Sequence, residues 1–187
     1  MASENDRAVL WTIFNPTSPF GNIPGLIQEE DLADDDCSFD PNLLKKVKNL
    51  ELQGVSAAES GDLKTALNYF DQAIQILPIR ASAYNNRAQA KRLQGDTDSA
   101  IEDLDQAILL SKGTGHTACQ ALVQRGLLLR LAHRDEDARA DFERAAALGS
   151  KFARQQAVIL NPYAALCNHM LSEVINNLRN PKVPETQ

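Results

Sequence analysis

The sequence predicts an all-α protein in which three helix pairs stack into a superhelix, with capping helices after them and a disordered acidic tail before them. Three observations support this prediction. Small and large apolar residues return at a fixed spacing along the middle of the chain. The same region consists of short stretches of helical periodicity separated by turn signals, and no strand is needed to explain it. Acidic residues are concentrated near the N-terminus.

The composition fits one helical domain with a tail. The chain has 187 residues, of which 43% are hydrophobic and 24% charged, enough for one sizeable core. Aromatic residues make up only 5%, which disfavours a β-sandwich. The net charge of −6 argues against generic nucleic-acid binding, because contacts to phosphates depend on basic side chains. No segment resembles a signal peptide or a membrane span, so we expect a protein of the cytoplasm, present also in the nucleus, that binds no membrane. We also expect it to be a monomer.

The N-terminal residues 1–39 are predicted to be mostly extended or disordered. No Lys or Arg occurs between Ala8 and Leu44, whereas Glu and Asp crowd the stretch after residue 28. The proline-rich sequence NPTSPFGNIPG at 15–25 cannot continue a helix, and the acidic run repels itself. We therefore treat this region as separate from the helical body.

Three aromatic residues in this tail, Trp11, Phe14 and Phe20, are candidate anchors. They could dock on a partner, or fold back into the protein's own groove while the acidic run lies against Arg92 and Arg130, which would be autoinhibitory. The alternative is that they simply pack on the outside of the helices.

Ordered structure is predicted to begin at Asp40, which can cap a helix whose first turn holds Pro41. The helices that follow are separated by the turn sequences SGD at 60–62, LPI at 77–79, QGD at 94–96 and SKGTG at 111–115. The GD pairs allow a positive φ at glycine, followed by an aspartate that can cap the next helix. The body is therefore expected to contain helices of similar length joined by tight turns.

The repeat itself is a trio of small, small and large residues. The second trio lies 34 residues after the first and the third lies 38 after the second; they are Gly54, Ala66, Phe70, then Ala88, Ala100, Leu104, then Gly126, Ala138, Phe142. The small residues let the two helices of a unit approach, and the large residue fills the gap to the next unit. In the third copy His133 and Arg134 replace the turn glycine and aspartate.

After the third unit, residues 151–179 are predicted to form capping helices, with a break at Asn161-Pro162. The last helix carries apolar residues down one face, and we expect it to cover the exposed side of the last repeat. Residues 180–187 are expected to be a frayed end.

The sequence offers no catalytic centre, metal site or cofactor site. Cys37, Cys119 and Cys167 are far apart and form no CxxC pair, and the three histidines occur singly, without metal-ligand spacing. No phosphate-binding or nucleophile motif is present. We expect a protein that is not an enzyme; a catalytic alternative would rest only on the nearness of His116 to Cys119 in sequence.

The spacing of Gly54, Ala66, Phe70 and Pro78, with the GD turn, resembles the tetratricopeptide repeat family over about residues 47–150. The resemblance implies a right-handed α-α superhelix with repeats at about 47–80, 81–114 and 119–152, and a concave groove that binds peptides. The family's groove positions correspond here to Lys48, Glu51, Val55, Asn85, Asn86, Gln89, Arg92, Gln120, Val123, Gln124, Leu127 and Arg130.

The resemblance also implies a non-enzymatic adaptor, with 70-kDa heat-shock chaperones as the leading specific partner. Chaperone-binding members clamp terminal carboxylates with two lysines, two asparagines and a further lysine or arginine; the matching positions here are Glu51, Val55, Asn86, Gln120 and Gln124. Only Asn86 fits, and Glu51 would repel a carboxylate. A co-chaperone-like contact is therefore expected to use a non-clamp mode. The alternative is a scaffold that stabilises a single client, such as a metabolic enzyme or a ciliary or trafficking complex.

Overall fold

The computed structural model describes residues 32–179, and every regular element in that range is a helix. The all-α prediction is confirmed. In chain order the elements are α2 (Pro41–Glu59), α3 (Leu63–Ile76), α4 (Ala81–Gln94), α5 (Thr97–Leu110), α6 (Gly115–Leu131), α7 (Asp135–Ala147), α8 (Lys151–Ile159) and α9 (Pro162–Arg179).

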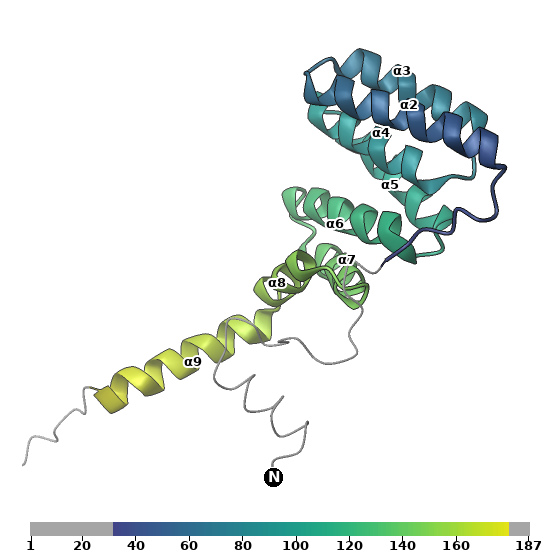
Figure 1. Ribbon diagram of the computed structural model, residues 1–187. Coiled ribbons are helices and arrows are strands. Elements are labelled where there is room, and N and C mark those ends of the chain that lie inside the picture. Colours follow the sequence, from purple (N-terminus) through teal and green to yellow (C-terminus); the bar gives the residue numbers. More distant parts are fainter. Residues whose placement is uncertain (1–31, 180–187) are drawn as a thin grey trace, which may run out of the picture.

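Six of these helices form three stacked pairs, α2 with α3, α4 with α5, and α6 with α7 (Figure 1). The second helix of each pair packs on the first helix of the next, so α3 contacts α4 and α5 contacts α6. The first helices also touch one another, α2 with α4 and α4 with α6. They form one continuous layer, which we call the inner surface.

The turns inside the pairs follow the predicted chemistry. Gly61 and Gly95 adopt φ of 86° and 91°, and the aspartate after each glycine caps the next helix. The carboxylate of Asp62 accepts a hydrogen bond from the backbone nitrogen of Thr65 at 3.1 Å. Hydrogen bonds from Thr65 hold the pKa of Asp62 below its usual value. In the third pair His133 takes the left-handed conformation, with φ of 57°.

The close approach of paired helices depends on the glycines of the repeat trio. A Cβ added at Gly54 would lie 2.5 Å from Cε1 of Phe70, and one at Gly126 would lie 2.9 Å from Cε1 of Phe142. Both rings are almost fully buried. The second pair has Ala88 and the smaller Leu104 in the same places, both buried. The same space is therefore filled by a glycine and a phenylalanine ring in the first and third pairs, and by an alanine and a leucine in the second.

The tail prediction needs correction for residues 32–39, which lie against the body and which we call the strap. Asp34 accepts hydrogen bonds from the backbone nitrogen and hydroxyl of Thr117, and Leu32 packs against the core of the second and third helix pairs. Asp36 forms an ion pair with Lys48 at 2.7 Å and also pairs with Arg80. Asp34 and Asp36 are anchored because a free backbone donor at the start of α6 and the cations Lys48 and Arg80 bind their carboxylates.

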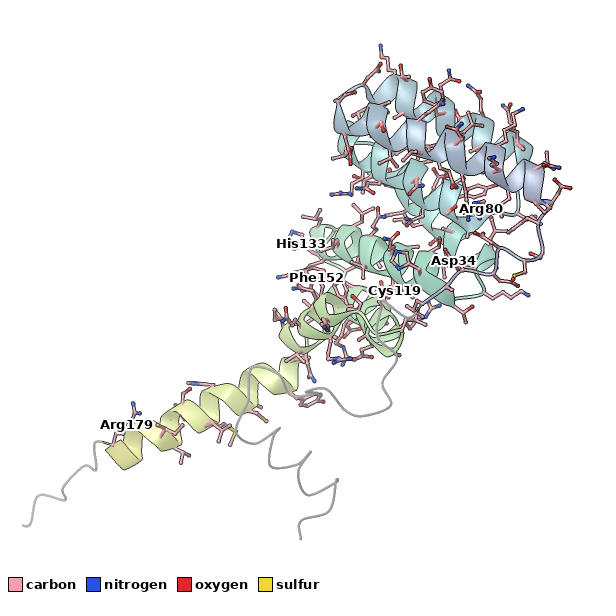
Figure 2. The ribbon with its side chains drawn as sticks, viewed as in Figure 1. Asp34, Arg80, Cys119, His133, Phe152 and Arg179 are labelled. Carbon is pink, nitrogen blue, oxygen red and sulfur yellow. The ribbon has the colours of Figure 1, made fainter. Side chains whose placement is uncertain are left out.

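In the autoinhibitory alternative the acidic run lies against Arg92 and Arg130, but these are not the residues that Asp34 and Asp36 bind. These two aspartates bind Lys48 within α2, Arg80 just before α4 and Thr117 near the start of α6. Figure 2 shows the labelled Asp34 and Arg80 on the side of the body where the strap runs. The tail anchors Trp11, Phe14 and Phe20 lie outside the described residues, as do residues 180–187.

The two C-terminal helices play different roles. α8 packs on α7, and the ring of Phe152 meets that of Phe142 edge to face, with centroids 6.3 Å apart. The expectation that the last helix covers the third repeat needs correction, because α9 extends away from the body (Figure 1) and its main contact is with α8. The short α8 already occupies the end of the stack.

Candidate functional site

The candidate site is the inner surface, and its first part lies where α2, α4 and the strap meet. The carboxylate of Glu51, which is buried, accepts hydrogen bonds from the hydroxyl of Ser82 at 2.5 Å and from Nε of Arg80 at 3.4 Å. Arg80 also binds Asp36, which in turn pairs with Lys48. Two predicted groove residues, Lys48 and Glu51, are thus engaged in an internal ionic network.

The cations of this network lower the pKa of Asp36. Partial burial raises the pKa of Asp36, but hydrogen bonds from Lys48 and Arg80 outweigh that effect, so the pKa lies below its usual value. The strap is therefore held as an anion against two cations at neutral pH.

The middle of the inner surface joins α4 to α6 through three amides. Asn85 is buried; its Nδ2 donates to Oε1 of Gln120 at 3.3 Å, and its Oδ1 accepts from Nε2 of Gln124 at 3.1 Å. Oε1 of Gln124 is buried and accepts no hydrogen bond within residues 32–179. These predicted groove residues mainly fix the two helices to each other.

An open part of the inner surface lies between α2 and α4, toward the ends of both helices. It is a cavity of about 140 Å³ that brings together three predicted groove residues, Val55, Asn86 and Gln89. The remaining lining residues are Ala58, Glu59, Phe70, Ala90 and Leu93. Val55 is 36% exposed and Leu93 54%. The cavity thus combines accessible apolar surface with two amides that can donate and accept hydrogen bonds.

The other predicted groove residues are divided between core and surface. Val123 and Leu127 are partly buried against the core of the second and third helix pairs. Arg92 and Arg130 are exposed, and Nη1 of Arg130 donates to Oε1 of Gln156 in α8 at 2.5 Å. The third repeat therefore contributes fewer solvent-accessible residues to the inner surface than the family's groove positions predict.

Sequence reasoning missed two ion clusters away from the groove positions, each built around a buried aspartate, Asp103 in one and Asp141 in the other. Arg87 donates to both carboxylate oxygens of Asp103, at 2.6 and 2.8 Å, and to Asp71 at 2.7 Å. Hydrogen bonding to Asp103 and Asp71 raises the pKa of Arg87 despite its partial burial.

The third repeat contains the same arrangement. Arg125 donates to Asp141 at 2.6 and 2.7 Å and to Asp105 at 2.6 Å. The signal was present in the sequence, because Arg125 and Asp141 follow Arg87 and Asp103 at the same 38-residue displacement as the apolar trio.

Metal-ligand groups and reactive thiols are scarce within residues 32–179. Residues 32–179 contain no group of three His, Cys, Asp or Glu side chains that could hold a metal ion. The thiol of Cys119 is buried, with its Sγ 3.7 Å from the carbonyl oxygen of Ala145, so it acts as part of the core between α6 and α7. No helix within these residues is long and apolar enough to cross a membrane.

Comparison with known proteins identifies relatives along the whole chain. The model of the tetratricopeptide repeat matches residues 81–114. The chain is 74% identical to tetratricopeptide repeat protein 36 of Danio rerio, with 100% of both chains covered. It is 59% identical to the protein of the same name from Homo sapiens, over 97% of this chain and 98% of that one.

Solved structures share the fold of the body. One is the first tetratricopeptide domain of Spaghetti (RPAP3) bound to the HSP90 peptide SRMEEVD, with a TM-score of 0.58 and 20% identity; the alignment covers 65% of this chain and 97% of that one. Another is the second such domain of human RPAP3 in complex with the HSP70 peptide SGPTIEEVD, with a TM-score of 0.55 and 22% identity over 63% and 97%. At this identity the likeness shows the fold alone.

Proposed function

Because this chain belongs to the tetratricopeptide repeat protein 36 family, we propose that it binds a peptide or protein partner on its inner surface, at the cavity between α2 and α4. Tetratricopeptide repeats are protein-interaction modules without enzymatic activity, so the chain is an adaptor and not an enzyme. We further propose that it works as a monomer in the cytoplasm and nucleus.

The observation that carries this proposal is the cavity itself. Val55 and Leu93 offer apolar surface for one side chain of a partner, while Asn86 and Gln89 lie beside it. An amide can donate to a backbone carbonyl and accept from a backbone N–H, which suits an extended peptide of unrestricted sequence. The ionic network around Glu51 does not reach the residues that line this cavity.

We propose a 70-kDa heat-shock chaperone as the partner, bound without a carboxylate clamp. The two related structures hold chaperone peptides that end in the acidic sequence EEVD. Here Glu51 is a buried anion already paired with Arg80, and Glu59 borders the cavity. A terminal carboxylate placed at Glu51 would meet a like charge, which opposes binding. Contact through another region of the chaperone avoids this repulsion.

The experiment is a titration of the protein with a purified 70-kDa chaperone and, separately, with its C-terminal peptide. We expect the whole chaperone to bind and the isolated peptide to bind weakly or not at all. The double variant Asn86→Ala with Gln89→Ala should weaken binding of the chaperone about tenfold, the loss that corresponds to about 1.4 kcal/mol.

The matched control is Asn68→Ala with Gln72→Ala, two exposed amide residues of α3 that bond only to each other. This variant should bind as the wild type does. Submicromolar binding of the isolated peptide would contradict the non-clamp mode. Equal affinity of both double variants would show that the cavity is not the docking site.

A further inference from the structure

Helix α9 has an apolar face that is exposed to solvent. Its large apolar side chains follow helical spacing and lie on one side; they are Tyr163, Leu166, Met170, Leu171, Val174 and Ile175. Each of them is between 48% and 75% exposed. Cys167, also exposed, lies in the middle of the same face. Figure 2 shows the labelled Arg179 at the far end of this helix, well away from the body.

An uncovered face of this kind is unfavourable on two grounds. A row of six large apolar side chains exceeds the scattered exposure that is normal for a soluble protein surface. A helix of 18 residues that receives little packing from other elements is also only marginally stable in water.

The path of the strap points to the chain's own N-terminal segment. Leu32, the first described residue, packs against the same core cluster as Leu160, which ends α8. On its N-terminal side the described chain therefore ends against the cluster that also includes the end of α8, the helix from which α9 leaves.

The length of the N-terminal segment is sufficient. Seventeen residues separate Phe14 from Leu32, and an extended chain of that length spans at most roughly 55–60 Å. The 18 residues of α9 rise only about 27 Å. The stretch between Phe14 and Leu32 can therefore extend to about twice the length of α9.

The chemistry of residues 8–14 suits the face of α9. Their sequence, AVLWTIF, contains six apolar residues and one threonine, and no charged residue occurs from 8 to 28. Among the polar side chains of α9, Nε2 of His169 lies 3.7 Å from Oε1 of Glu173. An uncharged apolar segment meets the exposed apolar face without burying an unpaired charge.

We propose that residues 8–14 bind along the apolar face of α9 within the same molecule, so that both ends of the chain form one additional apolar contact beyond the third repeat. This contact is separate from the inner surface, and it covers the face of α9 while leaving the cavity between α2 and α4 accessible.

The test uses Trp11, the single tryptophan of the chain. In the full-length protein its fluorescence emission should be shifted to the blue and protected from acrylamide, relative to a synthetic peptide of residues 1–31. The variant Leu166→Gln, Met170→Gln, Val174→Gln should shift the emission back toward that of the peptide. The control His169→Gln, Ser172→Gln changes the opposite side of α9 and should leave the emission unchanged.

Three results would overturn the proposal. Emission of the full-length protein equal to that of the peptide would show that Trp11 is not buried. A blue shift that ignores the α9 variant would place the segment elsewhere, on the repeats or in the groove. A blue shift that appears only as the concentration rises, together with a dimer in sedimentation, would show that a second copy covers the face.

A second measurement avoids any change to α9. In a Cys37→Ser background, Ile13→Cys places a thiol in the segment, and a short bis-maleimide can link it to Cys167; Cys119 is buried and reacts slowly. The control Asn22→Cys lies nine residues closer to Cys167 along the chain. Faster linking of Ile13→Cys within one molecule supports the contact. Equal or slower linking contradicts it, because chain proximity alone favours the control.

Discussion

Asp34 caps a helix that begins 81 residues later: its carboxylate accepts from the backbone nitrogen of Thr117 at 3.0 Å and from the hydroxyl of Thr117 at 2.5 Å. Thr114, the residue before α6, makes no side-chain cap of its own. Gly115 is required for this arrangement, because a Cβ there would lie 2.6 Å from Oδ1 of Asp34. The strap thus supplies the first helix of the third repeat with the cap that its own sequence lacks.

Asp34→Ala is expected to destabilise the protein by about 1–2 kcal/mol, the usual cost of losing a helix cap. Urea unfolding followed by circular dichroism measures the change. The control is Asp35→Ala, because the carboxylate of Asp35 bonds only to the nearby backbone nitrogen of Cys37. Similar losses for both variants would argue that the strap contributes through general charge and not through the cap.

The contact of Gly54 with Phe70 predicts a non-additive pair of substitutions. Gly54→Ala alone should cost about 1–3 kcal/mol through overpacking against the ring, despite the better helix propensity of alanine. Adding Phe70→Leu should recover part of the loss, because the second helix pair buries Ala88 with Leu104 in the same places.

The measurement is a double-mutant cycle of unfolding free energies, with Phe70→Leu as the second single variant. Additive losses in this cycle would mean that the backbone around residue 54 adjusts without involving the ring.

Acidification should weaken the strap through Asp36. The pKa of this carboxyl is lowered in the folded protein, so its contribution is present above the unfolded pKa, near 3.9, and is lost as the pH falls through the folded pKa. Comparing the urea midpoint at several pH values between about 6 and 3 tests this, and Asp36→Asn should show a shallower decline than the wild type. An identical slope in Asp36→Asn would assign the acid sensitivity to other carboxylates.

Removing Arg125 from its ion cluster should destabilise the protein more than removing Arg87 from the matching cluster. Removing Arg125 leaves Asp141, only 5% exposed, with a distant contact to Arg144 at 3.8 Å, whereas Asp103 keeps Lys91 at 2.9 Å when Arg87 is removed. We expect Arg125→Met to cost about 3 kcal/mol, because it leaves a buried charge without a close partner, and Arg87→Met to cost about half as much. Chemical denaturation of both variants decides the order; a larger loss for Arg87→Met would contradict this account.

The repeat architecture could be predicted from the sequence because it depends on volume at regular intervals. The pairing of Gly54 with Phe70 and of Gly126 with Phe142 is set by which residues fit a close helix crossing, and that is visible in residue sizes alone. The left-handed conformation of His133 could also be predicted, because one residue of the turn must adopt a positive φ and histidine tolerates it better than most residues.

The strap and much of the inner surface could not be predicted in the same way. A run of acids is typical of a solvated tail, and nothing near Asp34 in sequence reveals that Thr117 offers an unpaired backbone donor. The family register assigns Glu51 and Asn85 to the inner surface but gives no information on their partners, which come from other helices. Likewise the spacing of α9 predicts its apolar face but not the direction in which the helix leaves α8.

The arginine clusters have a consequence for how the body opens. Arg87 joins Asp103 of its own pair to Asp71 of the pair before, and Arg125 does the same with Asp141 and Asp105. If one helix pair unfolded, a carboxylate or guanidinium of the neighbouring pair would lose its ionic partner. We therefore expect the backbone amides of α3, α5 and α7 to exchange with deuterium in one concerted event. Amides of α9, beyond the last of these cross-links, should exchange first and independently.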